Sequence, residues 1–423
     1  MGLILYRLFW VLYRAGAALI SPWNPKGRLW IAGRKGIFPK IEAALAARPL
    51  QSSRVWMHCA SLGEFEQGRP LVEELKRKYP ETAVVISFFS PSGYEIRKDY
   101  PLADHVFYLP VDSEKNAERL ISLIKPSLVL WVKYEYWHFY LLALKKAEIP
   151  VLLVSGLFRQ SQPFFQWYGG FQRDILANFS RLFVQNQHSR DLLGSIGITG
   201  NVTVSGDTRF DRVIAIANGF SPIPLIDSFI SGRPTLVAGS TWQDDEEEID
   251  HFANTHPAMR FIIAPHEIDE PRLKEVESLF KQSARYSEYQ KNPSTERNTE
   301  ANVLIIDNIG MLSKLYHYAT IAFIGGGFGD DGIHNVLEAA VYGKPIIHGP
   351  EYEKFAEATD LVDLKASWPV ESAIEFEKVL SGLLSDTAVY NASARAAREY
   401  VAANAGATAK IMNYIQEKRL LTS

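Results

Sequence analysis

The stretch that most constrains the fold of this chain is residues 321–350, which are rich in glycine. Ile321–Ile324 is apolar, too short for a helix and followed by three glycines, so it predicts a buried strand. A glycine loop then leads into a predicted helix from about Ile333 to Tyr342, which Gly343–Pro345 ends because glycine and proline terminate helices. Ile346–His348 is the next predicted strand, so the stretch is one strand–helix–strand unit of an α/β sheet.

The glycine loop suits an anionic ligand. Gly326 and Gly327 let a ligand approach the backbone, and a helix that starts after the loop offers free N–H groups and the positive end of its dipole. Asn335 and Glu338 are three residues apart and would share a helix face, where a carboxylate can accept the hydroxyls of a ribose. No Gly-Lys-Ser/Thr follows, so this is not a Walker loop. A tight strand–helix turn that needs glycine is the alternative.

Predicted strands and helices alternate along the whole chain in two series, which indicates parallel sheets covered by helices. The expected strands are Arg54–Cys59, Thr82–Phe88, His105–Leu109, Leu128–Val132, Val151–Ser155, Arg181–Gln185 and Val202–Ser205, then Thr235–Ala238, Phe261–Ala264, Val303–Ile306, Ile321–Ile324 and Ile346–His348. Residues 283–301 are polar and are expected to form a loop.

We therefore expect an α/β fold with two Rossmann-like, doubly wound domains whose strand ends face a central cleft, the architecture of a two-Rossmann glycosyltransferase. The length of 423 residues also favours two domains. The expected parts are an N-terminal helix at 1–22, domains at 23–211 and 212–403, and a C-terminal helix at 404–423 that packs back on the first domain.

Composition limits the classes of partner and the compartment that fit this chain. The net charge is −3, which gives no global case for nucleic acid. Cys59 is the single cysteine, so an internal disulfide and a cysteine metal cluster are excluded and a reducing compartment fits.

The first 40 residues carry seven basic residues and no acidic one, and the first 20 are otherwise mostly apolar. Two arginines interrupt the apolar run and no A-x-A cleavage site is evident, which argues against a secretory signal. Arg7 and Arg14 would lie on one helix face, so we expect a helix in the bilayer interface. A membrane-spanning helix and a buried packing helix are the alternatives. Arg34 and Lys35 are further candidates for membrane or acceptor contact, and the basic flank favours the cytoplasmic face.

Three charged residues are candidates for chemistry. Glu64 lies where a strand meets a helix beside apolar residues that can raise its pKa, so it is either a general base or a helix-capping carboxylate. Glu135 stands among four aromatic residues and is either a sugar-site acid or a structural group. Arg209 lies within Gly206–Asp211 and could bind a carboxylate or phosphate, or form an ion pair within that segment.

Other polar residues follow strand ends in the second series. Ser240 and Thr241 are expected to begin a helix, as anion ligands or as caps. His266 follows Pro265 at the end of a strand, where a lone histidine is more often structural.

Taken together, these segments resemble the 3-deoxy-D-manno-octulosonic acid (Kdo) transferase family over nearly the whole chain. The resemblance rests on the basic apolar N-terminus and on His58-Cys59-Ala60-Ser61-Leu62-Gly63-Glu64, Glu135-x-Trp137, Gly206–Asp211, Ala238–Thr241, Asp307-x-x-Gly310 and the Gly325–Pro350 run with His334-Asn335-x-x-Glu338.

The resemblance implies an inverting GT-B glycosyltransferase of lipopolysaccharide biosynthesis at the cytoplasmic face of the inner membrane of a Gram-negative bacterium. Its donor would be CMP-Kdo and its acceptor a lipid A precursor, lipid IVA. Glu64 looks like the family's base on the acceptor hydroxyl, Glu135 like its second essential acid, and Arg209 stands where relatives have lysine or arginine. The residues that match the donor side are Ser240, Thr241, Pro265, His266, Gly310, Met311, Gly326, Gly327, Asn335 and Glu338.

The chain departs from the family's pattern at two places, and other functions are possible for this fold. Relatives commonly have Pro-Arg-His where this chain has Pro265–Glu267, and Gly-Glu-Leu where it has Gly310–Leu312. No Asp-x-Asp pair lies near the glycine loop, so we expect no metal and no cofactor besides the donor substrate. The rivals are another GT-B enzyme, such as a UDP-sugar transferase or a UDP-GlcNAc 2-epimerase, and a non-catalytic membrane-bound nucleotide or lipid binding protein.

Overall fold

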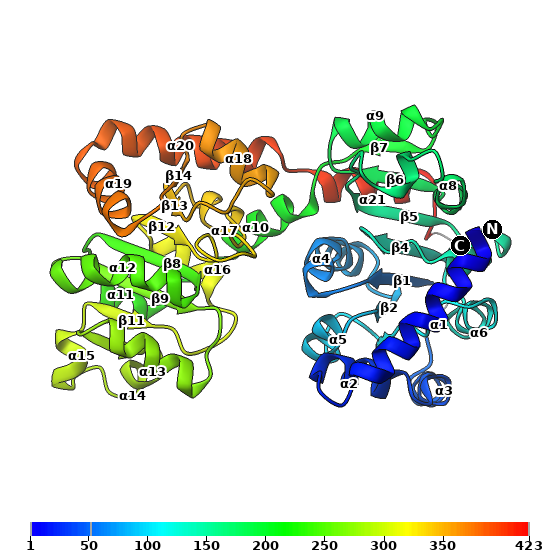
Figure 1. Cartoon of the computed structure of the whole chain (residues 1–423), viewed down its shortest axis with the longest axis horizontal. Helices are drawn as coiled ribbons and strands as arrows, with labels where there is room; N and C mark the ends of the chain where they lie inside the picture. Colours follow the sequence, from blue (N-terminus) through cyan, green and yellow to red (C-terminus); the bar gives the residue numbers. More distant parts are fainter. Residues whose placement is uncertain (1, 51–52, 422–423) are drawn as a thin grey trace. The chain divides into compact units, whose positions relative to one another are not determined.

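The computed structural model describes residues 2–50 and 53–421, and the chain divides into two compact units (Figure 1). The first unit is Met1–Arg212 together with Ala405–Ser423, and the second is Val213–Asn404. Each unit contains one seven-stranded sheet in which neighbouring strands pair in parallel, with helices around it. The expected fold of two doubly wound α/β domains is confirmed; that they face a central cleft stays a prediction.

In the first unit the strands are ordered β3-β2-β1-β4-β5-β6-β7. They are β1 (Arg54–Cys59), β2 (Ala83–Phe88), β3 (His105–Tyr108), β4 (Leu128–Val132), β5 (Val151–Gly156), β6 (Arg181–Val184) and β7 (Val202–Val204). The helices are α1 (Gly2–Ile20), α2 (Pro25–Arg34), α3 (Ile37–Ala47), α4 (Leu62–Lys78), α5 (Pro91–Arg97), α6 (Glu114–Ile124), α7 (His138–Lys146), η1 (Pro163–Phe165), α8 (Gly170–Leu176), α9 (Gln187–Ser195), α10 (Thr208–Asn218, which runs into the second unit) and α21 (Ala407–Glu417).

The core of the first unit lies on both faces of its sheet. Alternate residues of β1 point to opposite sides, so Trp56 packs with α3, α6 and α7, while Met57 packs with α4 and α21. Every residue of β2 and β4 is buried, as expected for central strands of a parallel sheet. This two-sided burial explains why these strands read as continuous apolar runs.

The C-terminal helix α21 completes the core of the first unit (Figure 1). Its residues Ile411 and Ile415 are fully buried in the apolar cluster on one face of the sheet. The carboxylate of Asp211 accepts from the backbone N–H groups of Gly406 and Thr408, both at 2.6 Å, and so fixes the start of the helix.

In the second unit the strands are ordered β10-β11-β9-β8-β12-β13-β14. They are β8 (Thr235–Thr241), β9 (Arg260–Pro265), β10 (Ser283–Arg285), β11 (Val303–Ile305), β12 (Ile321–Ile324), β13 (Ile346–His348) and β14 (Ser367–Pro369). The helices are α11 (Pro224–Ile230), α12 (Gln243–Thr255), α13 (Glu270–Leu279), α14 (Tyr286–Lys291), α15 (Glu296–Glu300), α16 (Leu312–Leu315), η2 (Tyr316–Tyr318), α17 (Leu337–Ala340), α18 (Ala356–Asp363), α19 (Ala373–Ser385) and α20 (Thr387–Ala403).

Two predictions for residues 283–342 of the second unit are wrong. The helix expected from Ile333 to Tyr342 is only α17, four residues long, because the N–H groups of Ile333 and His334 donate to the carbonyls of Glu351 and Gly325 and keep the preceding segment extended. The dipole of a long helix is therefore not available beside the glycine loop. The loop expected at 283–301 contains β10, α14 and α15.

Candidate active site

Both sheets place the candidate residues where their strand order reverses. The reversal falls between β1 and β4 in the first unit, and between β8 and β12 in the second. Doubly wound sheets bind ligands at this point, outside the carboxyl ends of the strands. Glu64 follows β1 and Glu135 follows β4, whereas Ser240 lies at the end of β8 and the glycine loop follows β12.

The carboxyl group of Glu64 is buried in the first turn of α4, with 8 % of the residue exposed. Its Oε2 accepts a hydrogen bond from the backbone N–H of Ala60, so it also holds the turn that enters the helix. Burial, followed by the negative charge of Glu135, raises the pKa of Glu64 to about 7. A carboxylate with this pKa can accept a proton near neutral pH, as a general base must.

The carboxyl group of Glu135 lies at the end of a chain of buried polar groups. Trp56 Nε1 donates to Ser87 Oγ at 2.8 Å, Ser87 Oγ meets His58 Nδ1 at 2.9 Å, and His58 Nε2 meets Glu135 Oε2 at 2.9 Å. Burial lowers the pKa of His58 to about 3, so its contact with Glu135 at neutral pH is a hydrogen bond of a neutral ring. Trp137 Nε1 donates to the same carboxylate oxygen at 3.1 Å.

Burial also raises the pKa of Glu135, to about 8. The two carboxyl groups are close enough for the charge of Glu135 to raise the pKa of Glu64, so the pair retains a proton near neutral pH. Two acids of shifted pKa at one strand-order reversal are typical of a reaction centre.

Sequence reasoning quoted His58 only as part of a motif and missed Ser87 altogether. His58 and Glu135 are 77 residues apart, and Ser87 lies within an apolar strand. The one feature of the sequence that could have indicated a role for Ser87 is that a polar residue stands in an otherwise apolar strand.

The guanidinium of Arg209 is already paired. Its Nε donates to Asp207 Oδ2 and its backbone N–H to Asp207 Oδ1, both at 2.9 Å. This is the ion pair that the sequence left open as the alternative. A contact between Arg209 and a donor substrate stays a prediction.

In the second unit, a buried carboxylate joins the two loops at the strand-order reversal. Asp245 Oδ2 accepts from the backbone N–H of Gly326 at 2.7 Å and from that of Trp242 at 2.9 Å. A Cβ on Gly325 would lie 2.4 Å from the carbonyl oxygen of Ser240, so the loops touch there and only glycine fits. Ser240 itself has a positive φ of 55°, a strained conformation that recurs at functional sites. Sequence reasoning missed Asp245, which stands in an acidic run.

Thr241 is turned into the interior of the second unit. Its hydroxyl donates to Glu246 Oε1 at 2.7 Å, and the other oxygen of Glu246 accepts from Arg272. Arg272 is therefore bound in a buried ion pair. The helix expected to begin at Ser240 and Thr241 begins instead at Gln243, after the cap residue Trp242.

His266 and His334 lie in a stack of three rings in the second unit. His266 lies 4.5 Å from the Trp242 ring and 4.7 Å from the His334 ring, measured between centroids. Burial, followed by the charge of His266, lowers the pKa of His334 to about 4. The neighbouring Pro265 ends β9. This stack provides an aromatic surface at the strand ends.

The last donor-side candidates surround the short helix α17 and the loop after β11. Asn335 Nδ2 donates to Glu338 Oε1 at 3.3 Å, so these two side chains do meet. Gly310 has a φ of 94°, which favours glycine, and Met311 precedes α16. Gly326 also has a positive φ, and a Cβ on Gly327 would lie 2.6 Å from the backbone nitrogen of Gly349.

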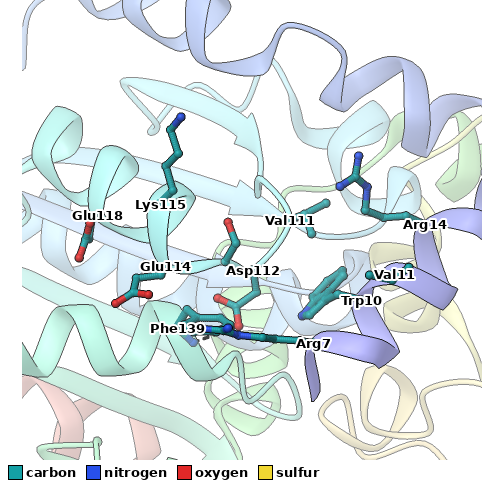
Figure 2. A pocket seen from close by; sticks show the side chains of 11 residues that line it. Arg7, Trp10, Val11, Arg14, Val111, Asp112, Glu114, Lys115, Glu118 and Phe139 are labelled. Carbon is teal, nitrogen blue, oxygen red and sulfur yellow. Dashed lines mark hydrogen bonds between the residues drawn. The ribbon is translucent and has the colours of Figure 1, made fainter. Parts of the chain in front are cut away.

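The N-terminal helix α1 lies on the first unit with one buried residue, Trp10. Its length and composition would allow it to cross a membrane, a weak criterion that signal sequences also satisfy. Several of its large apolar side chains are exposed: Leu3, Ile4, Leu5, Leu8, Phe9, Val11, Leu12, Leu19 and Ile20. A pocket of about 560 Å³ flanks the helix, lined by Arg7, Trp10, Arg14 and residues of α6 and the loop before it (Figure 2).

Arg34 has a packing role that the sequence did not indicate. Its Nε, Nη1 and Nη2 donate to the carbonyls of Leu109, Trp30 and Phe89 at 2.9, 3.2 and 2.7 Å. Burial lowers the pKa of Arg34 to about 10. Lys35, by contrast, lines a second pocket beside α1 together with Arg14.

Among the described residues, no group of three or more His, Cys, Asp or Glu side chains is arranged to hold a metal ion. Cys59 is buried as a free thiol.

Comparison with known proteins adds the following. The family described as 3-deoxy-D-manno-octulosonic-acid transferase (kdotransferase) matches residues 32–212. The chain is 25 % identical over 416 residues to the 3-deoxy-D-manno-octulosonic acid transferase of Haemophilus influenzae, covering 94 % of this chain and 93 % of that protein. It is 27 % identical over 340 residues to a bifunctional glycosyltransferase/methyltransferase of Fusobacterium nucleatum, covering 77 % of this chain but about half of that protein, 52 %.

The structure of the UDP-GlcNAc 2-epimerase from Neisseria meningitidis is similar with a TM-score of 0.56 and 17 % identity, covering 86 % of this chain and all of that one (100 %). At this identity the likeness shows the fold alone.

Proposed function

We propose that this chain, which belongs to the Kdo transferase family, transfers Kdo from CMP-Kdo to a hydroxyl group of a lipid A precursor such as lipid IVA. The observation that carries the proposal is a pair of carboxyl groups at the strand-order reversal of the first unit, Glu64, which is buried, and Glu135, whose side chain is 13 % exposed. The family match at residues 32–212 covers both glutamates.

In this proposal Glu64 removes the proton from the acceptor hydroxyl. The oxygen then forms a bond to the anomeric carbon of Kdo while the bond to the CMP phosphate oxygen breaks, so the configuration inverts. Burial and the charge of Glu135 raise the pKa of Glu64 to about 7, and Glu135, hydrogen-bonded to His58 and Trp137, also orients the acceptor. The leaving CMP carries one phosphate, which in this proposal binds at the strand-order reversal of the second unit, beside the glycine loop.

The experiment that tests this proposal is incubation of the full chain with CMP-Kdo, made in situ, and tetraacylated lipid A precursor, with products weighed by mass spectrometry. We expect a product heavier by one or more Kdo residues. Glu64→Gln should abolish transfer but still bind CMP, whereas Glu81→Gln, a change at an exposed glutamate after the same helix, should retain activity. Transfer by the Glu64→Gln variant would refute the assignment of the base.

Rival functions give different results in the same preparation. A UDP-sugar transferase or a UDP-GlcNAc 2-epimerase would be protected from heat by UDP rather than by CMP. A non-catalytic binding protein would bind nucleotide or lipid and form no product.

We also propose that the chain acts at the cytoplasmic face of the inner membrane, with α1 in the interface. The exposed apolar side chains of α1 and the nearby Arg7 and Arg14 support this placement. Deletion of residues 2–21 should move the protein out of the membrane fraction; an unchanged membrane fraction would contradict the proposal.

A further inference from the structure

The N-terminal helix is joined to the segment that carries Glu135. Helix α1 contacts this segment, which lies between β4 and α7, through Tyr6 and Trp10. We propose that these two residues are positioning residues for Glu135, so that α1 is part of the scaffold of the reaction centre as well as a membrane contact. The expected effect of these residues on turnover rests on the proposed function, whereas their effect on the order of this segment does not.

Tyr6 and Asp112 together cap the N-terminus of α7. The first backbone N–H groups of a helix lack partners within it, and the cap residue Trp137 provides none through its side chain. Instead, the N–H of His138 donates to the Tyr6 hydroxyl at 3.2 Å, and the N–H groups of Phe139 and Tyr140 donate to the carboxylate oxygens of Asp112, both at 3.0 Å.

The Tyr6 hydroxyl in turn donates to Asp112 Oδ2, so all of these groups form one buried network. Asp112 is 2 % exposed, and Figure 2 shows its carboxylate beside Phe139. Removal of the Tyr6 hydroxyl would leave the N–H of His138 without its partner, three residues after Glu135.

Trp10 reaches Glu135 through a second route. Its ring lies 5.0 Å from the ring of Trp137 and 6.1 Å from that of Phe89, which itself lies 5.0 Å from Trp137, measured between centroids. Trp137 Nε1 donates to Glu135 Oε2 at 3.1 Å. Because Trp10 is 5 % exposed while its neighbours Phe9 and Val11 are exposed, it packs on the protein and not on the surroundings.

Backbone geometry indicates why this segment needs external support. Lys133 has a positive φ of 60°, which is unfavourable for a residue with a side chain, and the carbonyl of Glu135 is held by Trp131 Nε1. A strained connection persists only when its surroundings fix it. Tyr6 and Trp10 supply that fixation from α1.

The first test is independent of activity. Hydrogen–deuterium exchange is measured on the full chain in phosphatidylethanolamine/phosphatidylglycerol vesicles, for the wild type and for Tyr6→Phe, Trp10→Ala and Tyr414→Phe. Tyr414 lies on α21, and its hydroxyl has no hydrogen bond to any residue that the structure describes, so it is the matched control for Tyr6. We expect exchange at residues 135–140 to be about tenfold faster in Tyr6→Phe, the size that loss of one or two hydrogen bonds gives, similarly faster in Trp10→Ala, which loses the ring contact with Trp137, and unchanged in the control.

The second test separates positioning from membrane binding. With CMP-Kdo and lipid A precursor, we expect Tyr6→Phe and Trp10→Ala to lower kcat about tenfold, with the donor KM within about twofold of wild type and unchanged flotation with vesicles. Trp10→Phe should restore most of kcat because it keeps an aromatic ring against Trp137.

Unchanged exchange at 135–140, or a loss of turnover that follows a loss of vesicle binding, would overturn the inference. If the wild type forms no product, the proposed function fails, and the exchange rates still decide whether α1 orders this segment.

Discussion

The buried carboxyl group of Glu64 should cost the protein stability at neutral pH. A rise of its pKa from 4.5 to about 7 on folding corresponds to about 3 kcal/mol of preference for the protonated form. The folded state therefore binds this proton more tightly than the unfolded state. The resulting stabilisation is complete below about pH 4.5 and is lost as the pH rises through 7.

Glu64→Gln removes this dependence on pH, and its amide oxygen can still accept from the N–H of Ala60. We expect the variant to be more stable than wild type by about 2–3 kcal/mol at pH 8 and by less than about 1 kcal/mol at pH 5. For a unit of this size, each kcal/mol raises the melting temperature by about 2–4 °C.

The assay compares the two proteins at each pH by calorimetry, with hydrogen exchange of the β1 amides to assign the transition to the first unit. Glu81→Gln, at an exposed position, should show no pH-dependent difference. An equal advantage at pH 5 and pH 8, or none at either, would refute the reasoning. A confirmed advantage, together with lost transfer, would indicate that stability is given up for catalysis.

Three further predictions follow from the contacts. Ser87→Ala should destabilise the first unit by about 1–3 kcal/mol, measured by thermal unfolding, because Trp56 Nε1 and His58 Nδ1 lose their shared partner inside the protein; an unchanged melting temperature would contradict the buried chain. Arg272→Met should cost about 3–5 kcal/mol in the second unit, seen as loss of its unfolding transition at the normal temperature, because Glu246 keeps a buried unpaired charge. EDTA should leave transfer unchanged, and activity that returns only with added Mg²⁺ would show a metal requirement.

The parallel sheets could be predicted from the sequence because their central strands are buried on both faces. β2 and β4 therefore appear as unbroken apolar runs, a pattern that depends only on neighbours in the chain. Glu64 and Glu135 could be singled out because each lies a few residues after the end of a predicted strand, Glu64 after β1 and Glu135 after β4.

The features that could not be predicted from the sequence depend on contacts between residues far apart in the chain. The helix expected at 333–342 does not form over its full length because the N–H of Ile333 donates to the carbonyl of Glu351. Helix propensity depends on neighbours in the chain and cannot predict a bond to a residue so far along the sequence. The hydrogen bonds from Arg34 to carbonyls 55 and 75 residues away could not be predicted, whereas its expected contact with the membrane or the acceptor stays a prediction. The connection from Tyr6 to the start of α7 spans 132 residues.

The return of α21 to the first unit has a consequence for biosynthesis. A ribosome releases residues 1–212 long before it makes residues 405–423, yet Ile411 and Ile415 belong to the same apolar cluster as Leu75 and Val84. Until residues 405–423 are made, the face of the sheet that carries α4 lacks part of its apolar cover, and the second unit can finish folding ahead of the first. A premature stop near residue 404 would thus harm the part of the protein made first.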